Sequence, residues 1–213
     1  MIGIYGGTFD PVHHGHLRTA FEVFEALNLS ELRFMPCGDI PAHRNRTVAT
    51  AQQRLAMIEL AIRENLGGYP IRTDAREVLR SGPSYMIDSL QSLRKESGGD
   101  RPLCLIVGQD AFSGFTSWQR WEQIFDYAHI IVMTRARAVL TMNEALAARV
   151  QSTSTDLPAD LRSQAAGLVY FIPVIQIDIS ASRIRKLAGA GRGICFLTPK
   201  PVIDFIDQQR IYR

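Results

Sequence analysis

Apolar and polar residues alternate along this chain with two different periods. Short, nearly continuous apolar runs are separated by longer segments in which apolar residues recur every three or four positions. The first pattern is typical of buried strands and the second of amphipathic helices. The predicted strands cover residues 2–5, 32–36, 69–73, 103–107, 129–133 and 168–172.

Residues that commonly flank helices mark where the predicted helices begin. Thr50 precedes a helical pattern and has Gln53 three residues later, a spacing typical of a capping box. This helix is expected to end before Gly67, and a second to run from near Ser84 to just before Gly98.

Two further helices are expected nearer the C-terminus. Thr141 with Glu144 has the spacing of an N-cap, and Thr198 is followed by Pro199, which suits the first helical position. The polar stretch 151–164 is compatible with a loop or a short helix.

The alternation of strands and helices predicts an α/β fold, a doubly wound and mainly parallel sheet with helices on both faces. In such sheets, ligands bind beyond the carboxyl ends of the strands. With 213 residues, 46% hydrophobic and 21% charged, one domain over 1–213 is expected, with a C-terminal helical part from about residue 180.

Charge and cysteine usage narrow the classes of protein. A net charge of +3 suits an anionic small-molecule substrate and lacks the basic density of a nucleic-acid binder. Cys37, Cys104 and Cys195 form no CxxC pair, which indicates reduced thiols and a cytoplasmic protein. No signal peptide or membrane helix is expected, and homo-oligomerisation stays open.

The largest group of candidate functional residues directly follows the first predicted strand. The segment 6–16 reads GGTFDPVHHGH, so a glycine turn is followed by His13 and His16 at the start of a helical pattern. Free backbone N–H groups and the helix dipole favour anions there. A metal site formed with Asp10 is an alternative, although zinc helices space their histidines four apart, and a chance surface cluster is another. The chain has neither a P-loop nor a GxGxxG fingerprint.

This segment resembles the signature of the HxGH nucleotidyltransferase superfamily, whose members transfer a nucleotidyl group from a nucleoside triphosphate to a phosphate. The resemblance implies a Rossmann-like nucleotidyltransferase fold and catalytic roles for His13, His16 and Arg185. The segment 179–185, ISASRIR, is similar to the second signature of that superfamily, in which hydroxyls and a cation hold phosphates. By itself, such a segment is more often an ordinary serine N-cap followed by a solvated basic face.

Further positions narrow the resemblance to nicotinate mononucleotide adenylyltransferases. Gly108 and Asp110 follow a strand, and Trp118 lies eight residues after Asp110, as in that subfamily, where this tryptophan stacks on the pyridine ring. Segment 77–85 is similar to the segment that holds the nicotinate carboxylate, and 41–44 to a phosphate-binding loop. The subfamily usually has a threonine where this chain has Met86. It also tends to read Arg-Pro-Gly after the strand at 129–133, where this chain has Arg135-Ala136-Arg137, so only Arg135 of that segment is carried over.

The resemblance implies ATP and nicotinate mononucleotide as substrates, with Mg²⁺ on the triphosphate and no protein metal site. The implied ATP-binding residues are Gly6, Gly7, Thr8, Phe9, His16, Arg44, Gly108, Asp110, Ile179, Ser182 and Arg185. The implied mononucleotide-binding residues are Thr8, Ser84, Tyr85, Trp118 and Arg135. Alternatives are another adenylyl- or cytidylyltransferase such as a pantetheine-phosphate enzyme, an aminoacyl-tRNA synthetase, and a nucleotide-sensing module. The first would leave Trp118 without a role.

Overall fold

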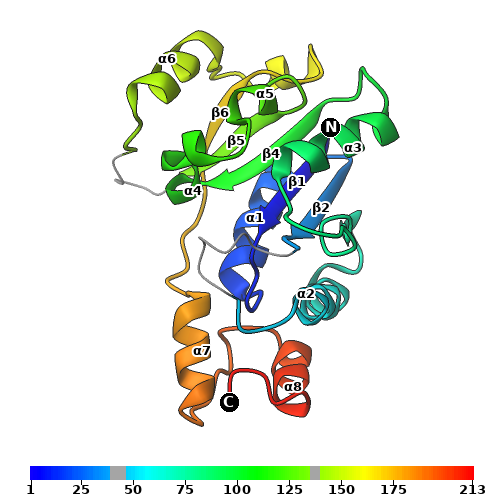
Figure 1. The fold of residues 1–213 in the computed structure, drawn as a ribbon, viewed down its shortest axis with the longest axis vertical. Helices are drawn as coiled ribbons and strands as arrows, with labels where there is room; N and C mark the ends of the chain where they lie inside the picture. Colours follow the sequence, from blue (N-terminus) through cyan, green and yellow to red (C-terminus); the bar gives the residue numbers. More distant parts are fainter. Residues whose placement is uncertain (39–46, 135–139) are drawn as a thin grey trace. The chain divides into compact units, whose positions relative to one another are not determined.

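A computed structural model describes residues 1–38, 47–134 and 140–213. Its six strands form one parallel sheet, hydrogen-bonded in the order β3-β2-β1-β4-β5-β6 (Figure 1). The strands are β1 (Ile2–Gly7), β2 (Glu31–Pro36), β3 (Ile71–Thr73), β4 (Leu103–Gly108), β5 (His129–Thr134) and β6 (Val169–Pro173). The predicted doubly wound α/β fold is confirmed.

The strand order reverses between β1 and β4, which pair directly, with Tyr5 beside Ile106. The glycines that end these two strands therefore lie at the same edge of the sheet. That edge is the topological switch point at which open α/β sheets bind ligands.

The chain forms two compact units. One comprises residues 1–6, 22–32 and 85–175, and the other 7–21, 33–84 and 176–213. The first contains strands β4, β5 and β6, and the interior residues of β4 and β5 are buried. In the second, α2 (Ala51–Leu66) packs against α8 (Lys200–Gln208), shown in cyan and red in Figure 1.

The remaining helices lie between strands, except the helix at 181–189, which follows β6. They are α1 (His14–Ala26), α3 (Met86–Ser97), α4 (Gln109–Ser113), α5 (Trp121–Ile124), α6 (Glu144–Thr153) and α7 (Ala181–Gly189), with short 3₁₀ turns at Phe115–Ser117 and Pro158–Arg162. The stretch 151–164 thus contains the end of α6 and a 3₁₀ turn. None of the described helices combines the length and apolar character that a membrane span needs.

The capping box predicted for α2 is present. The Thr50 side chain accepts a hydrogen bond from the Gln53 N–H, and the Gln53 side chain accepts one from the Thr50 N–H. The predicted end of α3 is also confirmed, because Gly98 adopts the positive φ of 85° that glycine tolerates.

Helix α3 has Tyr85 as its N-cap residue, so it begins near Ser84 as predicted. Two predicted helix starts were wrong. Helix α6 is capped by Asn143, whose side chain accepts from the Leu146 N–H, and not by Thr141. Pro199 is the N-cap residue of α8 and does not occupy its first turn. Strand β3 begins at Ile71, two residues after the predicted start.

Candidate active site

The glycine turn leads directly into α1 and brings two histidine rings together. His13 precedes the first residue of the helix, and the His16 N–H donates to the His13 carbonyl oxygen at 2.9 Å. The two imidazoles stack with centroids 3.6 Å apart and planes 22° apart. The Phe9 ring meets His16 edge-on, with centroids 5.1 Å apart. Both histidines therefore lie at a helix N-terminus, as predicted.

Burial keeps this pair uncharged at neutral pH. Burial, aided by the neighbouring His14, lowers the pKa of His13 to about 4. Burial and the adjacent His13 hold the pKa of His16 well below its ordinary value. A neutral imidazole carries one N–H donor and one acceptor nitrogen. The pair thus offers hydrogen-bond donors to an anion, without the mutual repulsion of two stacked cations.

Close packing explains two glycines of the motif. A Cβ atom on Gly15 would lie 3.0 Å from Nδ1 of His13, and one on Gly7 would lie 2.8 Å from the Phe9 ring. Phe9 itself has a positive φ of 51°, which is uncommon for a bulky residue and characteristic of functional turns. The turn is therefore shaped around the histidine rings and Phe9.

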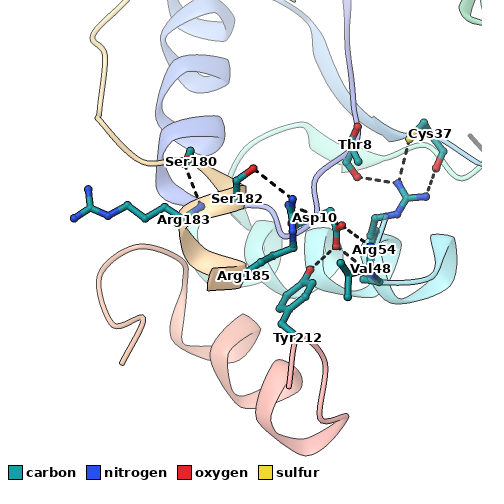
Figure 2. Close-up of polar contacts among 11 residues, drawn as sticks. Thr8, Asp10, Cys37, Val48, Arg54, Ser180, Ser182, Arg183, Arg185 and Tyr212 are labelled. Atoms are coloured by element: carbon teal, nitrogen blue, oxygen red, sulfur yellow. Dashed lines mark hydrogen bonds and ion pairs between the residues drawn. The ribbon is translucent and has the colours of Figure 1, made fainter. Parts of the chain in front are cut away.

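Asp10 is a buried hydrogen-bonding centre in the same turn (Figure 2). Its carboxylate accepts hydrogen bonds from the backbone N–H groups of Val48 and Ala49, and from the hydroxyl of Tyr212. These donors occupy both oxygens, so Asp10 does not suit metal ligation. Over the described part of the chain, no group of three or more His, Cys, Asp or Glu side chains could hold a metal ion.

Helix α7 presents the second signature to this turn. Ser180 caps the helix, accepting from the Arg183 N–H, as the ordinary serine N-cap interpretation expected. Arg185 donates to the Asp10 carbonyl oxygen at 2.7 Å and to the Ser182 hydroxyl at 3.3 Å. Figure 2 shows Arg183 pointing away from both. Arg185 and Ser182 are thus brought to the glycine turn, and the half-buried Ile179 directly precedes the cap.

The other predicted nucleotide-binding residues belong to the first unit. Gly108 is the N-cap of α4 and its φ is −74°, so neither its conformation nor a neighbouring described atom demands glycine there. Space beside a strand-end glycine suits close approach of a ligand. Asp110 is the second residue of α4 and not its N-cap, so it does not serve as the cap of that helix.

Trp118 follows the 3₁₀ turn Phe115–Ser117 and is half-buried. One side of its indole packs against the Phe115 ring, with centroids 4.9 Å apart and planes 38° apart. Trp121 packs edge-on against Phe115 and Phe125. The two tryptophans therefore differ, since Trp121 belongs to the aromatic cluster while Trp118 lies at its margin.

The start of α3 carries the predicted carboxylate-binding segment. Tyr85 is in extended backbone and its side chain makes no cap hydrogen bond. Asp88, in the first turn, forms an ion pair with Arg120. Ser84 belongs to the other unit, where its hydroxyl donates to the Glu77 carbonyl oxygen at 3.3 Å. A Cβ on Gly6 would lie 2.6 Å from the Met86 methyl group, so Met86 covers this glycine.

Two predicted residues, Arg44 and Arg135, lie outside the described residues. Thr8 is exposed, and its carbonyl oxygen accepts a hydrogen bond from Arg54 at 2.8 Å. Arg54 is 1% exposed and also donates to the carbonyl oxygens of Cys37 and Gly38. It thereby ties the glycine turn to the end of β2.

Sequence reasoning missed Arg54 and Tyr212. Arg54 left a usable signal, because it lies on the apolar face of α2 with Ile58 and Ala61, where a charge is unexpected. Tyr212, next to last in the chain, left none.

Known proteins resemble this chain over nearly its full length. The cytidylyltransferase-like family model matches residues 4–187. A protein of Methylococcus capsulatus named "Probable nicotinate-nucleotide adenylyltransferase" is 47% identical, covering 100% of this chain and 99% of its own. One of the same name from Halorhodospira halophila is 44% identical, covering 94% and 90%.

Solved structures support the same fold. The Plasmodium falciparum nicotinic acid mononucleotide adenylyltransferase complexed with NaAD has a TM-score of 0.73 at 18% identity, covering 99% of this chain and 96% of that one. The same enzyme complexed with APC has a TM-score of 0.70 at 17% identity. With its full-length relatives, strand order and histidine turn, the chain belongs to the cytidylyltransferase-like family and, within it, to the nicotinate-nucleotide adenylyltransferases.

Proposed function

We propose that this enzyme transfers AMP from ATP to nicotinate mononucleotide, giving nicotinate adenine dinucleotide and pyrophosphate, a step of NAD biosynthesis. The full-length similarity to relatives of that name carries the assignment. The intact stacked histidine pair beside Arg185 supplies the chemistry. None of the relatives reported above bears the name of a pantetheine-phosphate enzyme, and that alternative would leave Trp118 without a ligand.

The reaction needs no general base. The nucleophile is the phosphate of the mononucleotide, whose second pKa is about 6, so it is mostly dianionic at neutral pH. Its oxygen attacks the α-phosphorus of ATP, and the bond from that phosphorus to the β-phosphate oxygen breaks as pyrophosphate leaves. Catalysis then consists of holding two anions in line and stabilising the charge that develops.

The two neutral histidines serve as donors to the triphosphate in this proposal, with His16 on the α-phosphate. Their N–H groups already point from a helix N-terminus, so little reorganisation accompanies the reaction. Gly6, Gly7, Thr8 and Phe9 form the turn that lets the triphosphate approach the backbone. The close packing around Gly15 and Phe9 supports this role, because it fixes the rings before substrate binds.

Ser182 and Arg185 hold the β- and γ-phosphates, together with Arg44. The contacts of Arg185 with the Asp10 carbonyl oxygen and Ser182 use one N–H on each terminal nitrogen, and a guanidinium carries five N–H donors. The remaining donors suit a polyphosphate. Gly108, Asp110 and Ile179 are assigned to the adenosine.

The nicotinate end is assigned to Thr8, Ser84, Tyr85, Trp118 and Arg135. Trp118 stacks on the pyridine ring, and the first N–H groups of α3 receive the carboxylate. The Arg120–Asp88 ion pair supports this assignment, because it offsets the acidic residue in the first turn of that helix.

Mg²⁺ is proposed to enter with ATP, held by phosphate oxygens and water. The hydrogen-bonded carboxylate of Asp10 does not suit its ligation. Three free cysteines support a cytoplasmic location.

The test is pyrophosphate release from ATP with a panel of acceptors: nicotinate mononucleotide, nicotinamide mononucleotide and pantetheine phosphate. Turnover with nicotinate mononucleotide at least tenfold above the others supports the proposal. Preferred use of pantetheine phosphate, or no turnover with any acceptor, would overturn it.

A further inference from the structure

The C-terminal tail folds back onto the glycine turn. After α8, the Ile211 N–H donates to the Ile206 carbonyl oxygen at 2.9 Å, and the Tyr212 side chain is buried. The Tyr212 hydroxyl then donates to Oδ1 of Asp10 at 2.6 Å (Figure 2). A residue near the end of the chain thus contacts a residue of the first signature directly.

Two local features show that this placement is specific. Tyr212 has a positive φ of 69°, a conformation that a bulky residue adopts only when its surroundings impose it. A Cβ on Gly189, at the end of α7, would lie 2.9 Å from the Tyr212 carbonyl oxygen. The helix that carries Arg185 therefore leaves room for the tail.

Asp10 connects the tail to Arg185. The Asp10 carbonyl oxygen accepts from Nη1 of Arg185, and the same nitrogen lies 3.9 Å from Oδ2 of the carboxylate. The hydroxyl of Tyr212 and the N–H groups of Val48 and Ala49 already bond to that carboxylate. Oδ1 thereby has two donors and Oδ2 has one, and the guanidinium stays at the carbonyl oxygen instead of closing onto the carboxylate.

We propose that Tyr212 is a positioning residue for triphosphate binding, which acts through Asp10 on Arg185. Removing its hydroxyl leaves a buried carboxylate oxygen short of a donor, and such a group recruits the nearest available one. Nη1 of Arg185, already 3.9 Å from Oδ2 of Asp10, then closes onto the carboxylate and must be drawn off it by ATP. The inference rests on the proposed phosphate role of Arg185.

The first experiment compares Tyr212→Phe with the wild-type enzyme, and uses Tyr170→Phe on β6 as a control that removes a hydroxyl outside this network. We expect KM for ATP to rise about tenfold, equivalent to about 1.4 kcal/mol, in Tyr212→Phe only. KM for nicotinate mononucleotide and kcat should stay within about twofold. A merely structural role would instead lower apparent kcat with the folded fraction and leave both KM values unchanged.

A double-mutant cycle with Arg185→Ala tests the route through Arg185. Tyr212→Phe should have little further effect on KM for ATP once Arg185 is absent, because coupled residues are not additive. Additive effects, or an unchanged KM for ATP in Tyr212→Phe, would overturn the proposal. If Tyr212→Phe melts below the assay temperature, both enzymes are compared at a temperature below that melt, with the same pattern expected.

Calorimetric binding of tripolyphosphate separates this inference from the proposed function. Wild-type protein that binds tripolyphosphate about tenfold more tightly than Tyr212→Phe supports the positioning role, whatever acceptor the enzyme uses. Equal binding by the two proteins contradicts it, even if the wild type makes the dinucleotide.

Discussion

Two stacked imidazoles lie at the start of α1, and their protonation state decides what they can do. Were both protonated, rings 3.6 Å apart would repel each other and the helix N-terminus would disfavour them. As neutral groups they are compatible with burial and with each other. We infer that the positive potential for ATP comes from Arg185 and the helix N-termini, and that the histidines contribute directed N–H donors.

His16→Ala should lower kcat by roughly 10²–10³ while KM for ATP changes little, because its contact strengthens as charge builds on the α-phosphate. Steady-state kinetics with both substrates measures this. His14→Ala is the matched control, since His14 starts the same helix outside the stacked pair, and it should retain wild-type kcat. A His16→Ala enzyme within threefold of wild type would remove His16 from the catalytic role.

At the scale of elements, Trp118 packs beside the aromatic cluster of the first unit and is assigned to the pyridine ring of nicotinate mononucleotide. Trp118→Ala should raise KM for nicotinate mononucleotide and spare KM for ATP, since the indole is half-buried and packs on Phe115 outside the fully buried core. A thermal melt distinguishes this from a core role, which would cost about 3–5 kcal/mol of stability and impair both substrates together.

The start of α3 supports a prediction on the choice between acid and amide. A carboxylate offers only acceptors to the first N–H groups of the helix, whereas a carboxamide must direct its NH₂ at one of them. Leaving such a group unpaired costs about 1–3 kcal/mol, and the lost charge adds to it. We expect at least roughly a hundredfold preference for the acid in kcat/KM, or about 2.7 kcal/mol. Equal use of nicotinamide mononucleotide would refute the role of this helix start.

For the whole molecule, the buried histidines predict how stability depends on pH. Burial lowers the pKa of His13, His16 and His129 in the folded state, while the unfolded chain titrates near 6.5. The unfolded state therefore takes up protons first as the pH falls. Their contribution to stability is complete above about pH 6.5 and, for His13, declines down to about pH 4.

In that range His13 should remove up to about 1.4 kcal/mol of stability per pH unit, and His16 and His129 should lower stability in the same direction as the pH falls. Thermal melts from pH 8 to 5 measure this, and His129→Gln, which takes up no proton, should flatten the dependence. His129 is the most informative of the three, because its Nδ1 accepts from the Leu168 N–H and protonation removes that bond. A melting temperature independent of pH between 7 and 5 would contradict the prediction.

Local pattern was enough to predict the strands and the motif-bearing turns. The apolar runs at β1, β2, β4, β5 and β6 were located to within two residues, since a buried strand needs consecutive apolar side chains whatever surrounds it. The Thr50 cap was predicted because both of its hydrogen bonds join residues three apart. The family resemblance rested on similarly contiguous segments.

The wrong helix starts depended on partners distant in the sequence. Asn143 caps α6 while its amide donates to the Thr116 hydroxyl, a contact that Thr141 does not make. The Thr198 hydroxyl donates to the Val12 carbonyl oxygen, 186 positions away in the chain, and Pro199 is the N-cap residue of α8. Capping residues compete for several acceptors, and the fold decides which one is within reach.

The sequence by itself determined the fold class, the histidine turn and the family, because these depend on residues adjacent or regularly spaced along the chain. Only the tertiary structure decided that Asp10 accepts a hydrogen bond from Tyr212, and that Arg54 joins two loops. These partners are separated by up to 202 positions in the chain. Nothing in local spacing brings such groups together, since burying a charge is favourable only where the completed fold supplies its hydrogen bonds.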